Sequence, residues 1–101
     1  MHDLSAKQRA HLRSLSHPLK PIFHVGKDGL TDSSVVAIRQ AFNKRELMKV
    51  RVLEAAPDEA REVADGLAKT IDGRTTVVHV MGNVVTLYRA HPDQPEIKLP
   101  N

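Results

Sequence analysis

The feature that most restricts the fold is a two-residue turn near the carboxyl end of the chain. Strand-like runs at 75–81 and 84–89 are separated only by Gly82 and Asn83. A two-residue connection with glycine first is typical of a type II′ turn, which joins neighbouring antiparallel strands. The sequence therefore predicts a β-hairpin. Its predicted cross-strand pairs are Val80 with Val85 and Val78 with Leu87 on one face, and His79 with Thr86 and Val77 with Tyr88 on the other.

Upstream of the hairpin, helical and strand-like patterns alternate. Apolar residues recur at helical spacing in three segments, and two shorter runs have the composition or the period-two alternation of strands. Proline and glycine residues separate these segments. The expected elements are a helix at 5–17 (with a thin apolar stripe at Leu12 and Leu15), a strand at 22–25, a helix from the 31–34 cluster to 43–45, a strand at 47–53, and a helix opened by Pro57 and closed by a turn at Asp72-Gly73.

Residues that favour helix starts stand at the start of each expected helix. Ser5 is followed three positions later by Gln8, which is the capping-box spacing. The cluster at 31–34 is rich in N-cap residues. Pro57 suits a first helical position, with Asp58 and Glu59 in the first turn.

This order predicts a single α/β domain with one four-stranded mixed sheet. Two right-handed β-α-β crossovers make the first three strands parallel, and the hairpin adds an antiparallel strand. The second and third helices should share the sheet face that carries Val50, Val52, Val78, Val80, Val85 and Leu87. The opposite face should show Lys49, Arg51, His79, Thr86 and Tyr88, and the sequence leaves open whether the first helix covers part of it. We expect the domain at 1–90 and a proline-containing tail at 91–101 that carries no core of its own.

The charge of the chain is unevenly distributed. The net charge is only +3, but residues 1–51 hold ten basic and four acidic side chains, whereas residues 52–101 hold five basic and eight acidic ones. Such polarity indicates one surface that attracts a polyanion, with chance clustering on a solvated surface as the alternative.

Several function classes have no motif behind them. The chain lacks cysteine, an apolar segment of membrane-spanning length and an amino-terminal signal pattern, so we expect a cytoplasmic protein without a membrane partner. The six histidines lack metal-ligand spacing, and no P-loop or dinucleotide fingerprint is present. We therefore expect no catalytic residue, no metal, no cofactor and no small-molecule substrate.

Gly26-Lys27-Asp28-Gly29 lies between an expected strand and an expected helix. Two glycines allow a backbone turn to approach a ligand closely, and amides at the start of a helix favour an anion. A short Gly-x-x-Gly loop of this kind can clamp a nucleic-acid backbone. The alternative is a simple strand-to-helix turn, and Asp28 places a negative charge in the loop.

Four separated stretches, in order, give the chain a wider resemblance. They are residues 4–9, 21–31, 46–53 and 82–89. Together they resemble a CRM (chloroplast RNA splicing and ribosome maturation) domain of the stand-alone bacterial YhbY family, over roughly residues 4 to 90. The resemblance implies an RNA-binding α/β domain whose fold is similar to the C-terminal domain of a bacterial translation initiation factor. It also implies RNA contact through the Gly-x-x-Gly loop and association with ribosomal RNA in precursors of the large subunit.

The candidate RNA contacts combine this loop with basic side chains around it. They are Gly26, Lys27, Asp28, Gly29, Lys20, Lys49, Arg51, Lys7, Arg9, Arg13, Lys44, Arg45, Tyr88 and Arg89. Tyr88 could stack a base, although a half-buried tyrosine is the alternative. A protein-interaction module that uses the exposed sheet face is the second functional hypothesis. The oligomeric state stays open, a monomer being one alternative.

Overall fold

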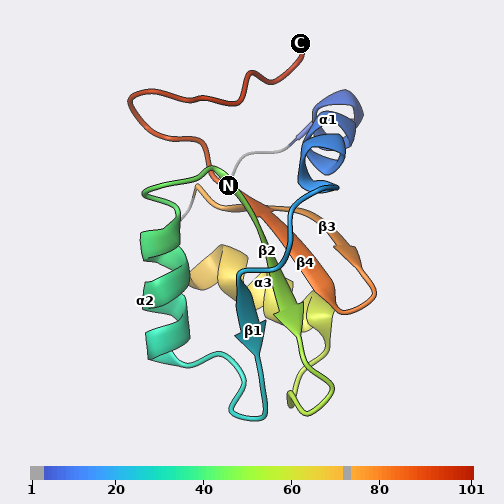
Figure 1. The fold of residues 1–101 in the computed structure, drawn as a ribbon, viewed down its shortest axis with the longest axis vertical. Helices are drawn as coiled ribbons and strands as arrows, with labels where there is room; N and C mark the ends of the chain where they lie inside the picture. The colour runs from blue at the N-terminus through green and yellow to red at the C-terminus, as the bar shows by residue number, and fades with distance from the viewer. Residues whose placement is uncertain (1–3, 72–73) are drawn as a thin grey trace.

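The computed structural model describes residues 4–71 and 74–101, and it places all of them in one α/β unit (Figure 1). The predicted turn at Asp72-Gly73 lies outside the described residues. The elements are α1 (Ala6–Ser16), β1 (Phe23–Val25), α2 (Asp32–Ala41), β2 (Leu47–Val52), α3 (Ala60–Thr70), β3 (Thr76–Met81) and β4 (Val84–Tyr88). Among these residues, no helix has the length and apolarity required to cross a bilayer.

The sheet has the predicted mixed topology. Its spatial order is β1-β2-β4-β3, so the last strand lies between β2 and β3. β1 pairs parallel with β2, and β4 pairs antiparallel with both of its neighbours. The first three strands therefore run in one direction and β4 runs in the other, as predicted. Gly82 in the hairpin turn has a φ of +58°, as the first position of a type II′ turn requires.

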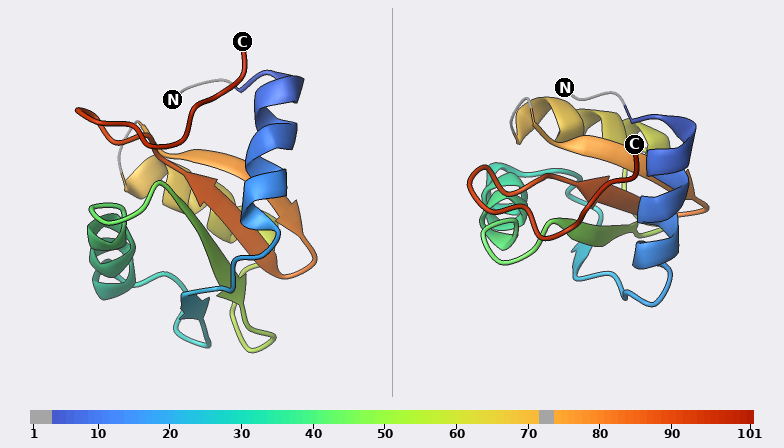
Figure 2. Two further views of the ribbon diagram at one scale, coloured as in Figure 1. Left: turned by 45° about the horizontal axis from the view of Figure 1, so that its top comes forward. Right: turned by 90° about the horizontal axis from the view of Figure 1, so that it is seen from above.

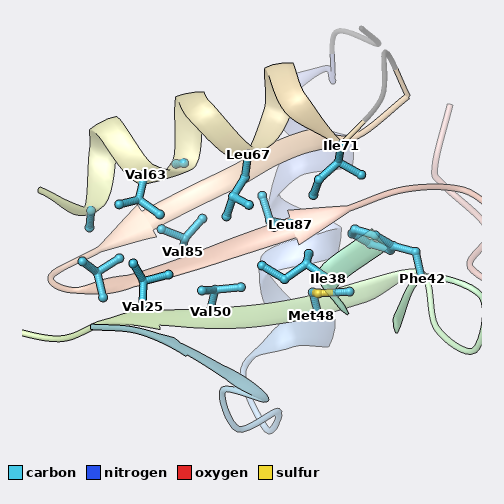
Figure 3. Close-up of a cluster of buried hydrophobic side chains, with 13 residues drawn as sticks. Val25, Ile38, Phe42, Met48, Val50, Val63, Leu67, Ile71, Val85 and Leu87 are labelled. Carbon is cyan, nitrogen blue, oxygen red and sulfur yellow. The ribbon is translucent and has the colours of Figure 1, made fainter. Parts of the chain in front are cut away.

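The main core lies between one sheet face and two helices (Figure 3). α3 lies across this face, and α2 stands along the β1 edge and sends Ile38 and Phe42 into the same core (Figure 1). Val63 and Leu67 of α3 are buried against the strands. The sheet contributes the predicted residues Val50, Val52, Val85 and Leu87, with Val80 packed at the margin.

One part of the predicted hairpin register is wrong, because β3 contains a β-bulge between Val77 and His79. Val80 still pairs with Val85, and His79 with Thr86, but Leu87 pairs with Val77 instead of Val78. Tyr88 accordingly pairs with Thr76 rather than with Val77. Because a bulge sets two residues against one, Val78 leaves the main core and packs on the opposite face.

α1 covers part of that opposite face, so α1 and α3 sandwich the sheet (Figure 2). Fully buried Leu12 forms a second cluster with Leu47, Val78 and Tyr88. Leu15 is 40% exposed, so the predicted apolar stripe of α1 reduces to Leu12.

The carboxyl-terminal tail packs at the margin of the second cluster. Ile97 and Leu99 pack against the cluster around Leu12, and the carbonyl of Pro100 accepts a hydrogen bond from the Gln8 side chain. The tail thus ends beside the amino-terminal end of α1 (Figure 2). Its prolines are compatible with packing because an extended segment needs no helical or ladder hydrogen bonds.

The helix starts follow the predicted caps at α1 and α2 but not at α3. The Ser5 capping box is present, and the Thr31 hydroxyl caps α2. α2 ends at Ala41, slightly before the predicted 43–45. Pro57 lies three residues before α3, whose N-cap is Glu59, so Pro57 belongs to the preceding loop rather than to the first turn.

A buried carboxylate holds the tail in place. Glu46 is 7% exposed and stands just before β2. Its carboxylate oxygens accept hydrogen bonds from the amides of His91, Glu96 and Ile97, at 2.6, 2.9 and 2.7 Å. Three amide donors around one ionised group compensate for its burial.

Replacing Glu46 with Gln should release the tail and lower the free energy of unfolding by about 2 kcal/mol, because one acceptor oxygen becomes an amide that cannot accept from backbone N–H groups. Urea unfolding measures the loss, and limited proteolysis reports the tail. Glu54→Gln, at an exposed turn position, is the control and should change neither. An unchanged midpoint for Glu46→Gln would show that the tail is not anchored in this way.

Candidate nucleic-acid interface

The Gly-x-x-Gly loop forms a tight turn at the carboxyl end of β1. The amide of Gly29 donates to the carbonyl of Gly26 at 2.9 Å, which leaves Lys27 and Asp28 exposed at the tip of the turn. Gly29 has a φ of +68°, and a Cβ atom there would lie 3.2 Å from Pro57 Cγ. A Cβ at Gly26 would make only an ordinary contact, 3.8 Å from the Leu53 side chain. Only the second glycine is therefore required by the backbone.

The start of α2 follows this turn. The Thr31 hydroxyl accepts a hydrogen bond from the Ser34 amide at 3.1 Å, so one of the free N–H groups at the start of the helix is already used. Asp32 is the first residue of the helix and adds a second carboxylate to that of Asp28. The positive end of the helix dipole therefore meets acidic side chains as well as Lys27.

A basic surface covers the sheet face that α1 leaves open. Lys49, Thr86 and His79 form one cross-strand row over β2, β4 and β3. On the next row, Arg51 of β2 pairs with His24 of β1, and its side chain is exposed. Lys49, Arg51 and His79 therefore lie on the face predicted for them. Arg13 of α1 borders the same row, because it lines a hollow together with Lys49 and His79.

Electrostatic effects on His79 show how much positive charge gathers there. Burial is the main cause that lowers the pKa of His79 below its usual value of 6.5. Neighbouring positive charges lower the same pKa further, in the order Arg13, Lys49 and Arg9. These positive charges disfavour protonation of His79, and the same positive charges attract an anion to the surface.

Three of the predicted contact residues are occupied by structural interactions. The Arg9 guanidinium donates to the carbonyl of Val77 at 2.8 Å and also to that of Val78. Arg89 is half-buried and lies over the Phe42 ring, 5.7 Å from its centroid. Tyr88 is 6% exposed, which contradicts the prediction that it shows on an open face available for base stacking. Burial also raises the pKa of Tyr88, and Glu46 raises it further.

The remaining predicted cations are exposed but lie in different places. Lys44 and Arg45 follow α2 and precede β2, at the end of the sheet opposite to the Gly-x-x-Gly loop (Figure 1). Lys7 is in the first turn of α1, next to Gln8, whose side chain donates to the carbonyl of Pro100. Lys20 lies in the connection from α1 to β1. The structure therefore groups Arg13, Lys49 and Arg51, and it places Lys44 and Arg45 at the other end of the sheet. The connection that carries Lys20 passes beside β2, because the amide of Ile22 donates to the carbonyl of Lys49 at 3.0 Å.

Two parts of the site were missed by sequence reasoning. His24 joins the basic face because it pairs with Arg51, a contact that requires knowledge of the β1–β2 register. His17 lines the hollow beneath α1. His17 comes four residues after Arg13, and side chains four apart are neighbours on a helix surface. This spacing is the sequence signal that places His17 beside Arg13.

The described residues at this surface offer cationic and neutral hydrogen-bond donors. Across 4–71 and 74–101, no three His, Asp or Glu side chains gather as metal ligands would. The charged neighbours that act on His79 are all cations, namely Arg13, Lys49 and Arg9. The fold and the site define an α/β domain with a basic sheet face and an adjacent glycine turn.

Comparison with known proteins identifies the family. Residues 4–89 match the CRS1/YhbY (CRM) domain, and the chain belongs to this family, as the resemblance predicts. It is 39% identical over 97 residues to the "Probable RNA-binding protein YqeI" of Bacillus subtilis, covering 96% of this chain and 99% of the relative. It is 31% identical over 100 residues to a Haemophilus influenzae protein named "RNA-binding protein", covering 99% and 98% of the two chains.

A solved structure shares the fold. The hypothetical protein SAV1595 of Staphylococcus aureus, for which RNA binding has been suggested, has a solution structure that matches with a TM-score of 0.79 and 37% identity. The match covers 97% of this chain and 100% of the other. The predicted fold class is thereby confirmed.

Replacing Gly29 with Ala should lower the free energy of unfolding by about 1–2 kcal/mol, because a Cβ is disfavoured at positive φ and would press on Pro57. Gly26→Ala is the matched control and should lie within about 0.5 kcal/mol of the unmodified protein. Thermal and urea unfolding of both variants measure the difference. Equal stabilities would show that the loop does not require its second glycine.

Proposed function

We propose that this protein binds RNA through the basic face around Lys49 and Arg51, together with the turn at Lys27. The observation that supports the proposal is that the charged side chains on this face are all basic. None of the four strands contains an Asp or Glu, and Arg13 of α1 extends the positive surface along one side. Phosphate contacts by Lys and Arg dominate nucleic-acid affinity, so a face of this composition suits an RNA backbone.

The family supports the same function. The relatives from Bacillus subtilis and Haemophilus influenzae carry RNA binding in their names. Within this function, we propose ribosomal RNA of large-subunit precursors as the partner and the cytoplasm as the location, in keeping with the resemblance to the stand-alone YhbY proteins. The protein would act there as a non-catalytic binder.

Selectivity for base sequence should be low. Lys49 and Arg51 are held on a sheet rather than on a helix that could enter a groove, and an RNA major groove is too narrow for side chains to read. Contacts to phosphates position a protein without reading sequence. Recognition would therefore depend on the shape of a folded RNA.

Replacing Lys49 and Arg51 together with Ala should weaken RNA binding about tenfold or more, because two phosphate contacts and their released counterions are lost. Fluorescence anisotropy with a structured ribosomal RNA fragment measures the affinity. Lys44→Ala with Arg45→Ala is the matched control, since it removes the same charge at the far end of the sheet and should cost less than about threefold.

The salt dependence of the same titrations separates RNA binding from the second hypothesis. The unmodified protein should lose affinity steeply with rising salt, and the Lys49/Arg51 variant should show a shallower slope. A flat response, or equal losses in both double variants, would contradict binding through this face. It would favour a protein partner on the sheet.

Replacing Lys27 with Glu should weaken RNA binding about three- to tenfold without changing the thermal midpoint, because the side chain is exposed at the tip of the turn. Asp28→Asn is the opposite variant and should strengthen binding slightly, since it removes the adjacent negative charge. Anisotropy titrations measure both. Unchanged affinity in both variants would mean that the loop is only a turn.

A further inference from the structure

A small hollow lies between α1 and the strands at the edge of the basic face. Its volume is about 150 Å³, and its lining includes Arg13, His17, Lys49, His79 and Thr86. It adjoins a more open groove along α1, to which Arg13, His17 and His79 also contribute. Sites for whole small-molecule ligands are typically about 300–1,000 Å³, so the hollow suits a single chemical group.

Thr86 is the unusual member of this lining. Its side chain is fully buried, and its hydroxyl has no hydrogen-bond partner among the described residues. A buried hydroxyl without a partner is costly, and valine has nearly the same shape without that cost. The hydroxyl is therefore poorly explained by packing alone.

The side chains around Thr86 favour a negatively charged ligand. Thr86 stands between Lys49 on β2 and His79 on β3 in one cross-strand row. His17 and Arg13 approach from α1, so cationic or neutral donors enclose the hydroxyl on both sides. Ser16 also lines the hollow, but its hydroxyl is used, because it donates to the carbonyl of Arg13 at 2.9 Å.

We propose that this hollow is a phosphate subsite that takes one backbone phosphate of the bound RNA. The Thr86 hydroxyl donates to a non-bridging oxygen at its base, and Lys49 and Arg13 neutralise the charge. The flexible Lys49 side chain moves aside to admit the phosphate, since it is only half-buried on the strand next to Thr86. The subsite rests on the proposed function and adds Thr86, His79 and His17 to it.

Two substitutions at Thr86 separate a ligand role from a structural role. Thr86→Val keeps the shape and removes the donor, so RNA affinity should fall about three- to tenfold while the thermal midpoint stays constant or rises. Thr86→Ser keeps the donor and loses a methyl group, so the affinity should stay within about twofold while the midpoint falls. If the Thr86→Val variant bound RNA with unchanged affinity, the subsite would be overturned and the proposed function would remain intact.

Inorganic phosphate provides a probe that does not depend on RNA. In ¹H–¹⁵N spectra, phosphate should shift the amides of Thr86 and His79 saturably, and Thr86→Val should abolish the effect. Absence of these shifts in the unmodified protein would overturn the subsite. Phosphate shifts combined with undiminished RNA binding by Thr86→Val would assign the hollow to free phosphate and overturn the RNA assignment. If the unmodified protein bound phosphate but no RNA, the proposed function would fail, and so would the RNA assignment.

Discussion

The hydrogen bonds from Arg9 to the bulged strand β3 join helix α1 to the sheet. The guanidinium donates to the carbonyls of Val77 and Val78, where the extra residue interrupts the ladder. Such carbonyls need donors when they are part-buried, and a planar guanidinium can serve two at once. The bulge directs Val78 toward Leu12 while His79 stays paired with Thr86. One irregularity thus fixes both the packing of α1 and the row of groups that forms the basic face.

Local chemistry made much of the fold predictable from sequence. Gly82-Asn83 specified the hairpin, the Ser5 capping box specified the start of α1, and alternation in β2 placed Lys49 and Arg51 on one face. These features depend on residues that are close in sequence, where spacing determines direction. Sequence order and crossover handedness then implied the parallel and antiparallel relations of the strands.

Long-range contacts explain what the sequence did not reveal. The carbonyls at the bulge in β3 accept hydrogen bonds from Arg9, nearly seventy positions away, and Tyr88 is buried in a cluster with residues of α1 and of the tail. Glu46 looked like an ordinary charge beside a strand, yet its partners lie at 91–97. For the same reason, a list of cations cannot separate Arg9 and Arg89, which are used internally, from Lys49 and Arg51. Charge counts indicated that a basic surface exists, and only tertiary contacts indicate which cations form it.

The packing of the aromatic residues constrains the kind of recognition that this face can perform. The chain has only three Phe, Tyr and Trp residues. Phe42 and Tyr88 are buried, and Phe23 packs against the main core, so these rings offer no stacking platform for bases. Neighbouring strands lie about 4.8 Å apart, so the backbone positions of Lys49 and His79, two strands apart in one row, are kept roughly 10 Å apart. If the proposed RNA contact is made through this face, it would distinguish RNAs by how their phosphates are arranged in space, which requires a folded RNA.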